Sequence, residues 1–309
     1  MKIFIYLGYP RSASTYMQKN YFSNNKEINY IGRKINYGKE DYNFYNALEK
    51  IIGYSENDFF CNRKKLLLQL KKIKFSKKKK NLISEEGLLC QFYWRNNDIY
   101  RTLTRIISLF DDLKITCNFI TTIRNQSECI ESIYQYFYSS YFKKNFDSLD
   151  NFLELKKHKN KKILYSFDYL KLFEFFKKKN KKILFLLFED LKNNEDEIKI
   201  KLMYFLGLKY QFNTESKNII NNRENIIFKY KINYKIIIKI MKNLFNFKKY
   251  IIAYKNYLRI KHDLYALKNF KLTIVQKKKI YNIYILQNKK LSKYIKLNSK
   301  YLEYKKIKN

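Results

Sequence analysis

The feature that most constrains the fold is a short turn near the N-terminus, between an apolar run and a helix-like segment. The apolar run is Ile3–Leu7, and the turn over Gly8–Thr15 is rich in small residues. Backbone N–H groups at the start of a helix have no partner inside the helix and lie at the positive end of its dipole, so such a turn can bind a phosphate. The stretch predicts a strand, a phosphate-binding turn and a helix start.

The turn differs from the nucleotide-triphosphatase loop G-x-x-x-x-G-K-[ST] at its decisive position. Gly8 begins the pattern, but Ser14 stands where the lysine that contacts the β- and γ-phosphates is required. The nearest cation is Arg11, which can reach a short phosphate group but is poorly placed for a triphosphate tail. The turn therefore favours a nucleotide with a modified 5′-phosphate over ATP.

The same residues carry a resemblance to a known family. Pro10–Thr15 resembles the 5′-phosphosulfate loop of sulfotransferases, P-[KR]-[ST]-[GA]-[ST]-T, and those enzymes use 3′-phosphoadenosine 5′-phosphosulfate (PAPS). The resemblance implies that this loop binds PAPS through Arg11, Ser12, Ala13, Ser14, Thr15 and Tyr16. Taken alone, six residues of this kind are equally well explained as a turn without a ligand.

A second motif follows the β-branched run Ile115–Ile123. Arg124, Asn125 and Gln126, with Ser132 eight residues after the arginine, resemble the sulfotransferase 3′-phosphate motif, in which proline is usual at the position of Gln126. An arginine at the end of a buried strand faces the ligand crevice, and a serine two turns into the next helix returns to the same side. The resemblance implies that Arg124 and Ser132 hold the 3′-phosphate. The alternatives are a surface salt bridge for Arg124 and an exposed helix position for Ser132.

A third segment begins at Phe188. The stretch Phe188–Lys192, followed by Phe205–Leu208, resembles the family's Y-E-D-L and F-L-G-L segments, with Phe188 in place of the tyrosine. Phe188 keeps the ring and loses the hydroxyl. We interpret Glu189 and Asp190 as structural carboxylates that cap a helix or pair with a lysine.

The candidate general base lies after the predicted strand Asn81–Ser84. Glu86 matches an S-x-E-x-L pattern of bacterial relatives, and Glu85 is the other candidate. Adjacent side chains on an extended segment point to opposite sides, so only one of the two can face the crevice. In the alternative reading both are solvated or cap the following helix.

Strands that alternate with helices predict the fold class. The four apolar runs Ile3–Leu7, Asn81–Ser84, Ile115–Ile123 and Ile183–Phe188 are separated by segments with helical spacing. We therefore expect an α/β fold, with a P-loop NTPase-like central parallel sheet flanked by helices, over residues 1–225. The pattern from Ser23 to Phe60 is irregular and yields no predicted element. Residues 226–309 are predicted to form a basic helical extension packed on this domain.

The formal charge of +38 over 309 residues suits anionic partners. These include nucleotides, sulfated or phosphorylated glycans, an anionic membrane surface and nucleic acid. A lysine-rich composition alone raises the charge, so it does not choose among them. With no run of 18 apolar residues, we expect a cytoplasmic protein. Four cysteines without C-x-x-C spacing and two histidines lead us to expect no metal site.

The motifs together predict a sulfotransferase that moves a sulfuryl group from PAPS to a hydroxyl or amine of an acceptor, with a carbohydrate as one candidate. Glu86, or Glu85, would deprotonate the acceptor, and Arg11 would neutralise charge on the leaving group. One alternative is a P-loop small-molecule kinase. Another is a basic nucleic-acid or anionic-surface binding protein, although the motifs make a nucleic-acid partner the less expected one.

Overall fold

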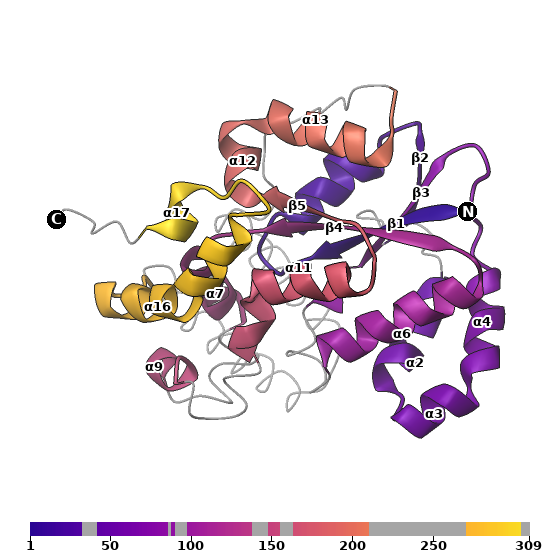
Figure 1. The fold of residues 1–309 in the computed structure, drawn as a ribbon, viewed down its shortest axis with the longest axis horizontal. Helices are drawn as coiled ribbons and strands as arrows, with labels where there is room; N and C mark the ends of the chain where they lie inside the picture. The colour runs from indigo at the N-terminus through magenta and orange to yellow at the C-terminus, as the bar shows by residue number, and fades with distance from the viewer. Residues whose placement is uncertain are drawn as a thin grey trace, which may run out of the picture.

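The computed structural model describes residues 1–32, 42–85, 88–89, 98–137, 148–154, 163–209 and 270–303. At its centre is a five-stranded sheet in the order β2-β3-β1-β4-β5, and every strand pairing is parallel (Figure 1). The strands are β1 (Lys2–Gly8), β2 (Ile28–Gly32), β3 (Lys80–Glu85), β4 (Thr116–Ile123) and β5 (Ile183–Leu187). The predicted α/β fold with a central parallel sheet is confirmed.

Both faces of the sheet are covered, as the near-continuous apolar strands require. Side chains alternate along β1, with Ile3 and Ile5 in the larger hydrophobic core and Phe4 and Tyr6 in the smaller one. Because β1 is the central strand, it links the two cores. The Tyr6 hydroxyl shares a hydrogen bond of 2.8 Å with Thr122 Oγ1 on β4.

The helices form one layer on each face of the sheet (Figure 1). The larger core includes residues of α2 (Tyr42–Gly53), α3 (Glu56–Cys61), α4 (Arg63–Lys71), α6 (Ile99–Asp112), α7 (Gln126–Phe137), α9 (Leu149–Phe152), η4 (Tyr165–Phe167), α11 (Tyr169–Lys178), α16 (Ile274–Leu291) and α17 (Ser299–Leu302). The smaller core includes residues of α1 (Ser14–Met17), the π-helical turn η1 (Gln18–Phe22), α12 (Phe188–Asn193) and α13 (Glu195–Leu206).

The described part of the region from Ser23 to Phe60 forms regular elements, so the interpretation of its pattern as irregular was wrong there. It contains the edge strand β2 and the helices α2 and α3. The strand is only five residues long and its middle is half-exposed, so it lacks the apolar run of a central strand. The buried face of α2, which is Phe44, Ala47, Leu48 and Ile51, does have helical spacing.

Helical spacing in the sequence begins at Glu128, but helix α7 begins two residues earlier, at Gln126. The Asn125 side chain caps it, because Oδ1 accepts hydrogen bonds from the backbone N–H groups of Ser127 (3.1 Å) and Glu128 (3.3 Å). Helix α13 ends where Gly207 adopts a left-handed conformation with φ of 66°, which glycine reaches without steric strain.

Residues 270–303 are the described part of the predicted C-terminal extension. Helix α16 packs on α7 and α11, and its Ile280 and Leu291 are buried in the larger core. The Tyr284 hydroxyl donates to Leu164 O at 2.7 Å. A domain boundary at residue 225 falls outside the described residues and stays a prediction. Within the parts of the chain that the structure describes, no helix combines the length and apolar character needed to cross a membrane.

Candidate active site

Two of the predicted motifs lie side by side at the carboxyl edge of the sheet. From β1 the chain crosses to the β2–β3 side, and from β4 it crosses to β5, so the connections diverge between these adjacent strands. Ligands of open α/β sheets bind at such a topological switch point. Gly8 at the end of β1 pairs with Thr122 near the end of β4. The loop after β1 and the Arg124 motif after β4 therefore lie next to each other, on either side of the switch point where a ligand would bind.

The loop after β1 is tightly wound. Arg11 (φ 65°) and Ala13 (φ 62°) both adopt the left-handed region, although neither is glycine. The turn is closed by two bonds to Tyr9 O, one from the Ser12 N–H at 3.3 Å and one from the Ser14 hydroxyl at 3.1 Å. Turns that contain left-handed residues present backbone N–H groups on a concave side that suits an anion.

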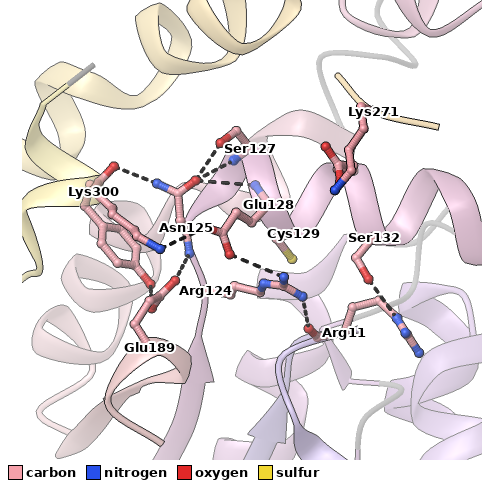
Figure 2. Close-up of polar contacts among 12 residues, drawn as sticks. Arg11, Arg124, Asn125, Ser127, Glu128, Cys129, Ser132, Glu189, Lys271 and Lys300 are labelled. Atoms are coloured by element: carbon pink, nitrogen blue, oxygen red, sulfur yellow. Dashed lines mark hydrogen bonds and ion pairs between the residues drawn. The ribbon is translucent and has the colours of Figure 1, made fainter. Parts of the chain in front are cut away.

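The Arg11 side chain reaches from the loop to helix α7 (Figure 2). Its Nε donates to Ser132 Oγ at 3.0 Å, and its guanidinium lies 4.8 Å from the ring centroid of Tyr136. Arg11 and Ser132 were assigned to different phosphate motifs and are 121 positions apart in the chain. The structure brings them into direct contact.

Arg124 lies between the loop and the start of α7. Its Nη1 donates to Arg11 O at 3.2 Å, and its Nη2 pairs with Glu128 Oε2 at 3.3 Å (Figure 2). The guanidinium also lies 4.4 Å from the ring centroid of Phe188. Its Nε is buried and has no hydrogen-bond partner among the described residues. The salt bridge considered for Arg124 is thus present together with the contact to the loop.

Glu128 stays ionised in this setting. Burial opposes its ionisation, but the positive charges of Arg124 and Lys300 outweigh that effect and lower the pKa of the carboxyl. Lys300 Nζ lies 3.2 Å from Glu128 Oε1. An anion that binds Arg124 must therefore compete with Glu128 for one edge of the guanidinium.

The remaining loop residues differ in how they could contribute. Ser12 and Ser14 are buried, whereas Ala13 and Thr15 are half-buried. The Tyr16 hydroxyl donates to Glu195 Oε1 at 2.7 Å in the smaller core, and burial together with this bond raises its pKa. The Tyr16 hydroxyl is therefore bonded to α13, so Tyr16 would contact a ligand through its backbone N–H and not through its hydroxyl.

Of the two candidate bases, the structure describes Glu85. It is the last residue of β3, opposite Leu7 of β1, and is half-buried at the same edge of the sheet as the loop. Glu86 lies outside the described residues, so its role stays a prediction. Within β3, Ser84 Oγ accepts a bond of 2.9 Å from the Gln18 amide.

Several residues that hold the Arg124 motif were not found from the sequence. Tyr169 donates its hydroxyl to Arg124 O at 2.7 Å, and Tyr301 donates its hydroxyl to Glu189 Oε2 at 2.8 Å. Glu189 Oε1 accepts from the Asn125 N–H at 3.0 Å, which agrees with the structural role expected for Glu189. No spacing or motif in the sequence connects these tyrosines to Arg124, because their positions depend on tertiary packing.

Cys129 lies beneath the loop and is unsuited to act as a nucleophile. Its thiol donates to Pro10 O at 3.5 Å, and burial raises its pKa to about 11, so it is neutral near pH 7. Across the described residues, no group of three or more histidine, cysteine or acidic side chains is arranged to bind a metal ion.

A cavity of about 280 Å³ lies between the start of α7 and the C-terminal helices α16 and α17. Its lining includes Asn125, Glu128, Lys277, Tyr281 and Lys300. None of the loop residues lines it. The cavity is therefore adjacent to the Arg124 motif but separate from the predicted phosphate loop.

Comparison with known proteins identifies the family. A family model described as "Sulfotransferase domain" matches residues 2–263, which include all three motifs. The chain belongs to the sulfotransferase domain family. As a member of that family it is a sulfuryl-transferring enzyme, and the resemblance noted from its motifs is confirmed.

Among solved structures, this sulfotransferase is similar to a sulfotransferase from Alicyclobacillus acidocaldarius. The two are 12% identical, the match covers 73% of this chain and 90% of that chain, and the TM-score is 0.45. No curated protein matches the sequence.

Proposed function

We propose that this sulfotransferase uses PAPS as its donor and transfers the sulfuryl group to a hydroxyl or amine of an acceptor. The observation that carries the proposal is the contact between the two motifs at the switch point. Arg124 donates to the Arg11 carbonyl, and the Arg11 side chain donates to Ser132. A nucleotide with phosphates at both its 5′ and 3′ positions needs two such anion-binding groups close together.

The residues present fit this donor. Arg11 and the N–H groups of Ser12–Thr15 would bind the 5′-phosphosulfate, and Arg124 with Ser132 would bind the 3′-phosphate. Arg124 has a buried Nε without a partner among the described residues, and unmade hydrogen bonds of this kind are costly. The Arg124 and Lys300 charges both contact the single carboxylate of Glu128. This excess of positive charge suits a phosphate dianion.

The reaction balances with groups from this chain. The acceptor O–H or N–H loses its proton to a carboxylate, for which Glu86 is the first candidate and Glu85 the second. The acceptor atom forms a bond to sulfur while the bond from sulfur to the 5′-phosphate oxygen breaks. The negative charge that develops on the departing 3′,5′-bisphosphate, PAP, is stabilised by Arg11 and the loop N–H groups.

The acceptor is the less constrained half of the proposal. We expect a hydroxyl-rich or amine-bearing molecule, with carbohydrates to be assayed first. We also expect the C-terminal lysines to recruit an anionic acceptor or membrane surface. A small-molecule kinase is disfavoured because Ser14 occupies the position of the phosphate-binding lysine and its hydroxyl bonds to Tyr9 O. A nucleic-acid binder would instead show affinity that falls steeply with salt and no affinity for PAP.

The assignment of the 3′-phosphate contact can be tested with Arg124→Ala. PAP and AMP differ by that phosphate, and a hydrogen bond to a charged group contributes roughly 1.5 to 3 kcal/mol. The variant should bind PAP about 10- to 150-fold more weakly and leave the affinity for AMP nearly unchanged, as measured by calorimetry. Arg63→Ala is the matched control. That arginine contacts Ser108 and Asp112 of α6, which carries neither motif, so its loss should leave the ratio of PAP to AMP affinity unchanged. Equal losses for both nucleotides would contradict the assignment.

A further inference from the structure

Gln126 makes a contact that the proline usual at its position could not make. It is the first residue of α7, and its buried side chain faces Asn288 of α16. Gln126 Nε2 donates to Asn288 Oδ1 at 3.0 Å, and Asn288 Nδ2 donates to Gln126 Oε1 at 3.2 Å. The two amides thus form a reciprocal pair. Asn288 lies beyond residue 263, where the match to the family ends.

Further bonds connect the same two segments. Asn288 Nδ2 also donates to Tyr301 O at 3.0 Å, and Tyr301 donates its hydroxyl to Glu189. Glu189 accepts from the Asn125 N–H, and Asn125 Nδ2 donates to Lys300 O at 2.7 Å (Figure 2). Both residues that follow Arg124 in the chain are therefore held, directly or through one side chain, by α16 and α17.

We infer that α16 and α17 position the Arg124 motif for the nucleotide, and that the Gln126–Asn288 pair is the principal contact. The inference rests on the proposed function, because it concerns the 3′-phosphate contact of that same site. It assigns the C-terminal segment an effect on nucleotide recognition that acts through uncharged amides, in addition to the charge that Lys300 brings to Glu128.

The physical reason lies in how the start of α7 is restrained. Proline at a first helical position fixes φ through its ring and needs no N–H partner. Glutamine provides no such restraint, so here the restraint comes from its side chain. A buried amide pair is favourable only while both partners are satisfied, since a lone buried amide loses its hydrogen bonds to water without replacement. The pair therefore favours one position of Gln126 and of the two residues before it.

Asn288→Ala in the full chain tests the inference. It removes both bonds of the amide pair and leaves Gln126 Nε2 with only its 3.5 Å bond to Phe167 O, so the position of Arg124 becomes less defined. The affinity for PAP should fall about three- to thirtyfold, the range seen when residues that touch no ligand alter coupling. The affinity for AMP, which lacks the 3′-phosphate, should stay within about twofold. Calorimetry with each nucleotide gives both values.

Tyr284→Phe is the matched control on the same helix. It also deletes one buried hydrogen bond of α16, the bond to Leu164 O, but it leaves the Gln126–Asn288 pair in place. It should lower stability without changing the ratio of PAP to AMP affinity. If it lowers this ratio as much as Asn288→Ala does, α16 contributes general packing only and the inference is wrong.

A double variant keeps the test decisive if Asn288→Ala does not fold. Gln126→Pro together with Asn288→Leu replaces the side-chain tie by the ring of proline and leaves no amide of the pair unsatisfied. It should recover the wild-type ratio of PAP to AMP affinity. A folded double variant that has lost this ratio would contradict the inference.

Hydrogen exchange separates failure of this inference from failure of the proposed function. If the wild type binds PAP and AMP equally, the proposed donor is wrong, but the positioning of residues 124–128 can still be measured. Exchange of those amides should accelerate in Asn288→Ala and not in Tyr284→Phe. Equal exchange in the two variants would show that the pair does not position the motif.

Discussion

Arg124 is held from several directions by other residues of the chain. Tyr169 binds its carbonyl oxygen, Glu128 pairs with its guanidinium, and the Phe188 ring lies against the guanidinium face. Groups that are oriented in advance stabilise charge without a cost of reorganisation when the ligand binds. These three contacts come from α11, α7 and α12.

Glu85, the last residue of β3, and its neighbour Glu86 provide a prediction about the general base. Glu86→Gln should lower turnover about 10²- to 10⁴-fold, the usual contribution of general-base catalysis, while the affinity for PAP stays near the wild-type value. Glu85→Gln should have much less effect, because adjacent side chains on extended backbone point to opposite sides. Steady-state rates with a sulfuryl acceptor, combined with PAP titrations, measure both. The reverse ranking would transfer the role to Glu85.

Glu189 leads to a prediction about pH. Burial raises the pKa of its carboxyl above the ordinary 4.5, although hydrogen bonds from Asn125 and Tyr301 oppose the shift. A carboxyl whose pKa is raised on folding favours the folded state at low pH, and this contribution is lost as pH rises from 4.5 through the raised pKa. The free energy of unfolding of the wild type, relative to Glu189→Gln, should therefore decrease over that window in urea titrations.

The comparison with Glu189→Gln isolates the titration of Glu189, and the sign of the change in relative unfolding free energy with pH tests the prediction. The glutamine variant keeps an acceptor for the Asn125 N–H and cannot ionise, so other titrating carboxyls, including Glu128, cancel in the comparison. A relative stability of the wild type that increases with pH over the same window would contradict the assigned environment of Glu189.

For individual residues, the sequence predicted which residues of the two motifs lie close together, but not which other residues hold them in position. Arg11, Arg124 and Ser132 belong to patterns with fixed spacing, and the structure brings all three together. Tyr169 and Tyr301 belong to no pattern, and each is one among 30 tyrosines in the chain. Their roles arise from tertiary packing, which a single sequence does not specify.

Among the secondary-structure elements, four strands were predictable, including the edge strand β5, and the other edge strand, β2, was not. β1, β3, β4 and β5 have the buried apolar runs expected of strands covered on both faces. The edge strand β2 has fewer apolar residues because part of it faces solvent. The start of α7 was placed two residues late because the Asn125 cap was not recognised.

Arg105 of α6 provides a prediction about how the helices of the larger core are joined. Its guanidinium is buried, donates to the carbonyl oxygens of Ile51, Tyr54 and Ser55, and lies 4.6 Å from the Phe59 ring centroid. Arg105→Met keeps the apolar stem but leaves those carbonyls without their donor. The variant should lose about 3 kcal/mol of unfolding free energy, since each bond to a charged group contributes roughly 1.5 to 3 kcal/mol.

Urea unfolding measures this loss, and Lys199→Met is the control. Lys199 forms an ion pair with Asp196, whose side chain is solvent-exposed. Removal of this pair should therefore cost less than about 1 kcal/mol of unfolding free energy. The affinity of Arg105→Met for PAP should equal that of the wild type. A cost no larger than that of the control would show that Arg105 does not join α6 to the segment from α2 to α3.

At the scale of the whole molecule, the order of the strands determines the position of the site. The order β2-β3-β1-β4-β5 makes β1 and β4 neighbours, although more than 100 residues separate them, and their ends carry the two motifs. The alternation of strands and helices predicts a parallel sheet but does not specify this order. The structure shows this order, which brings the two distant motifs close enough to bind one nucleotide, as we propose.

Calorimetry of the wild-type protein with PAP, AMP and ATP under one set of conditions tests the proposed donor most directly. PAP should bind most tightly, at least about tenfold more tightly than AMP, because the 3′-phosphate adds a charge-assisted bond. ATP should bind weakly, since no lysine occupies the position of Ser14. Equal affinities for PAP and AMP, or an affinity for ATP that matches that for PAP, would contradict the account.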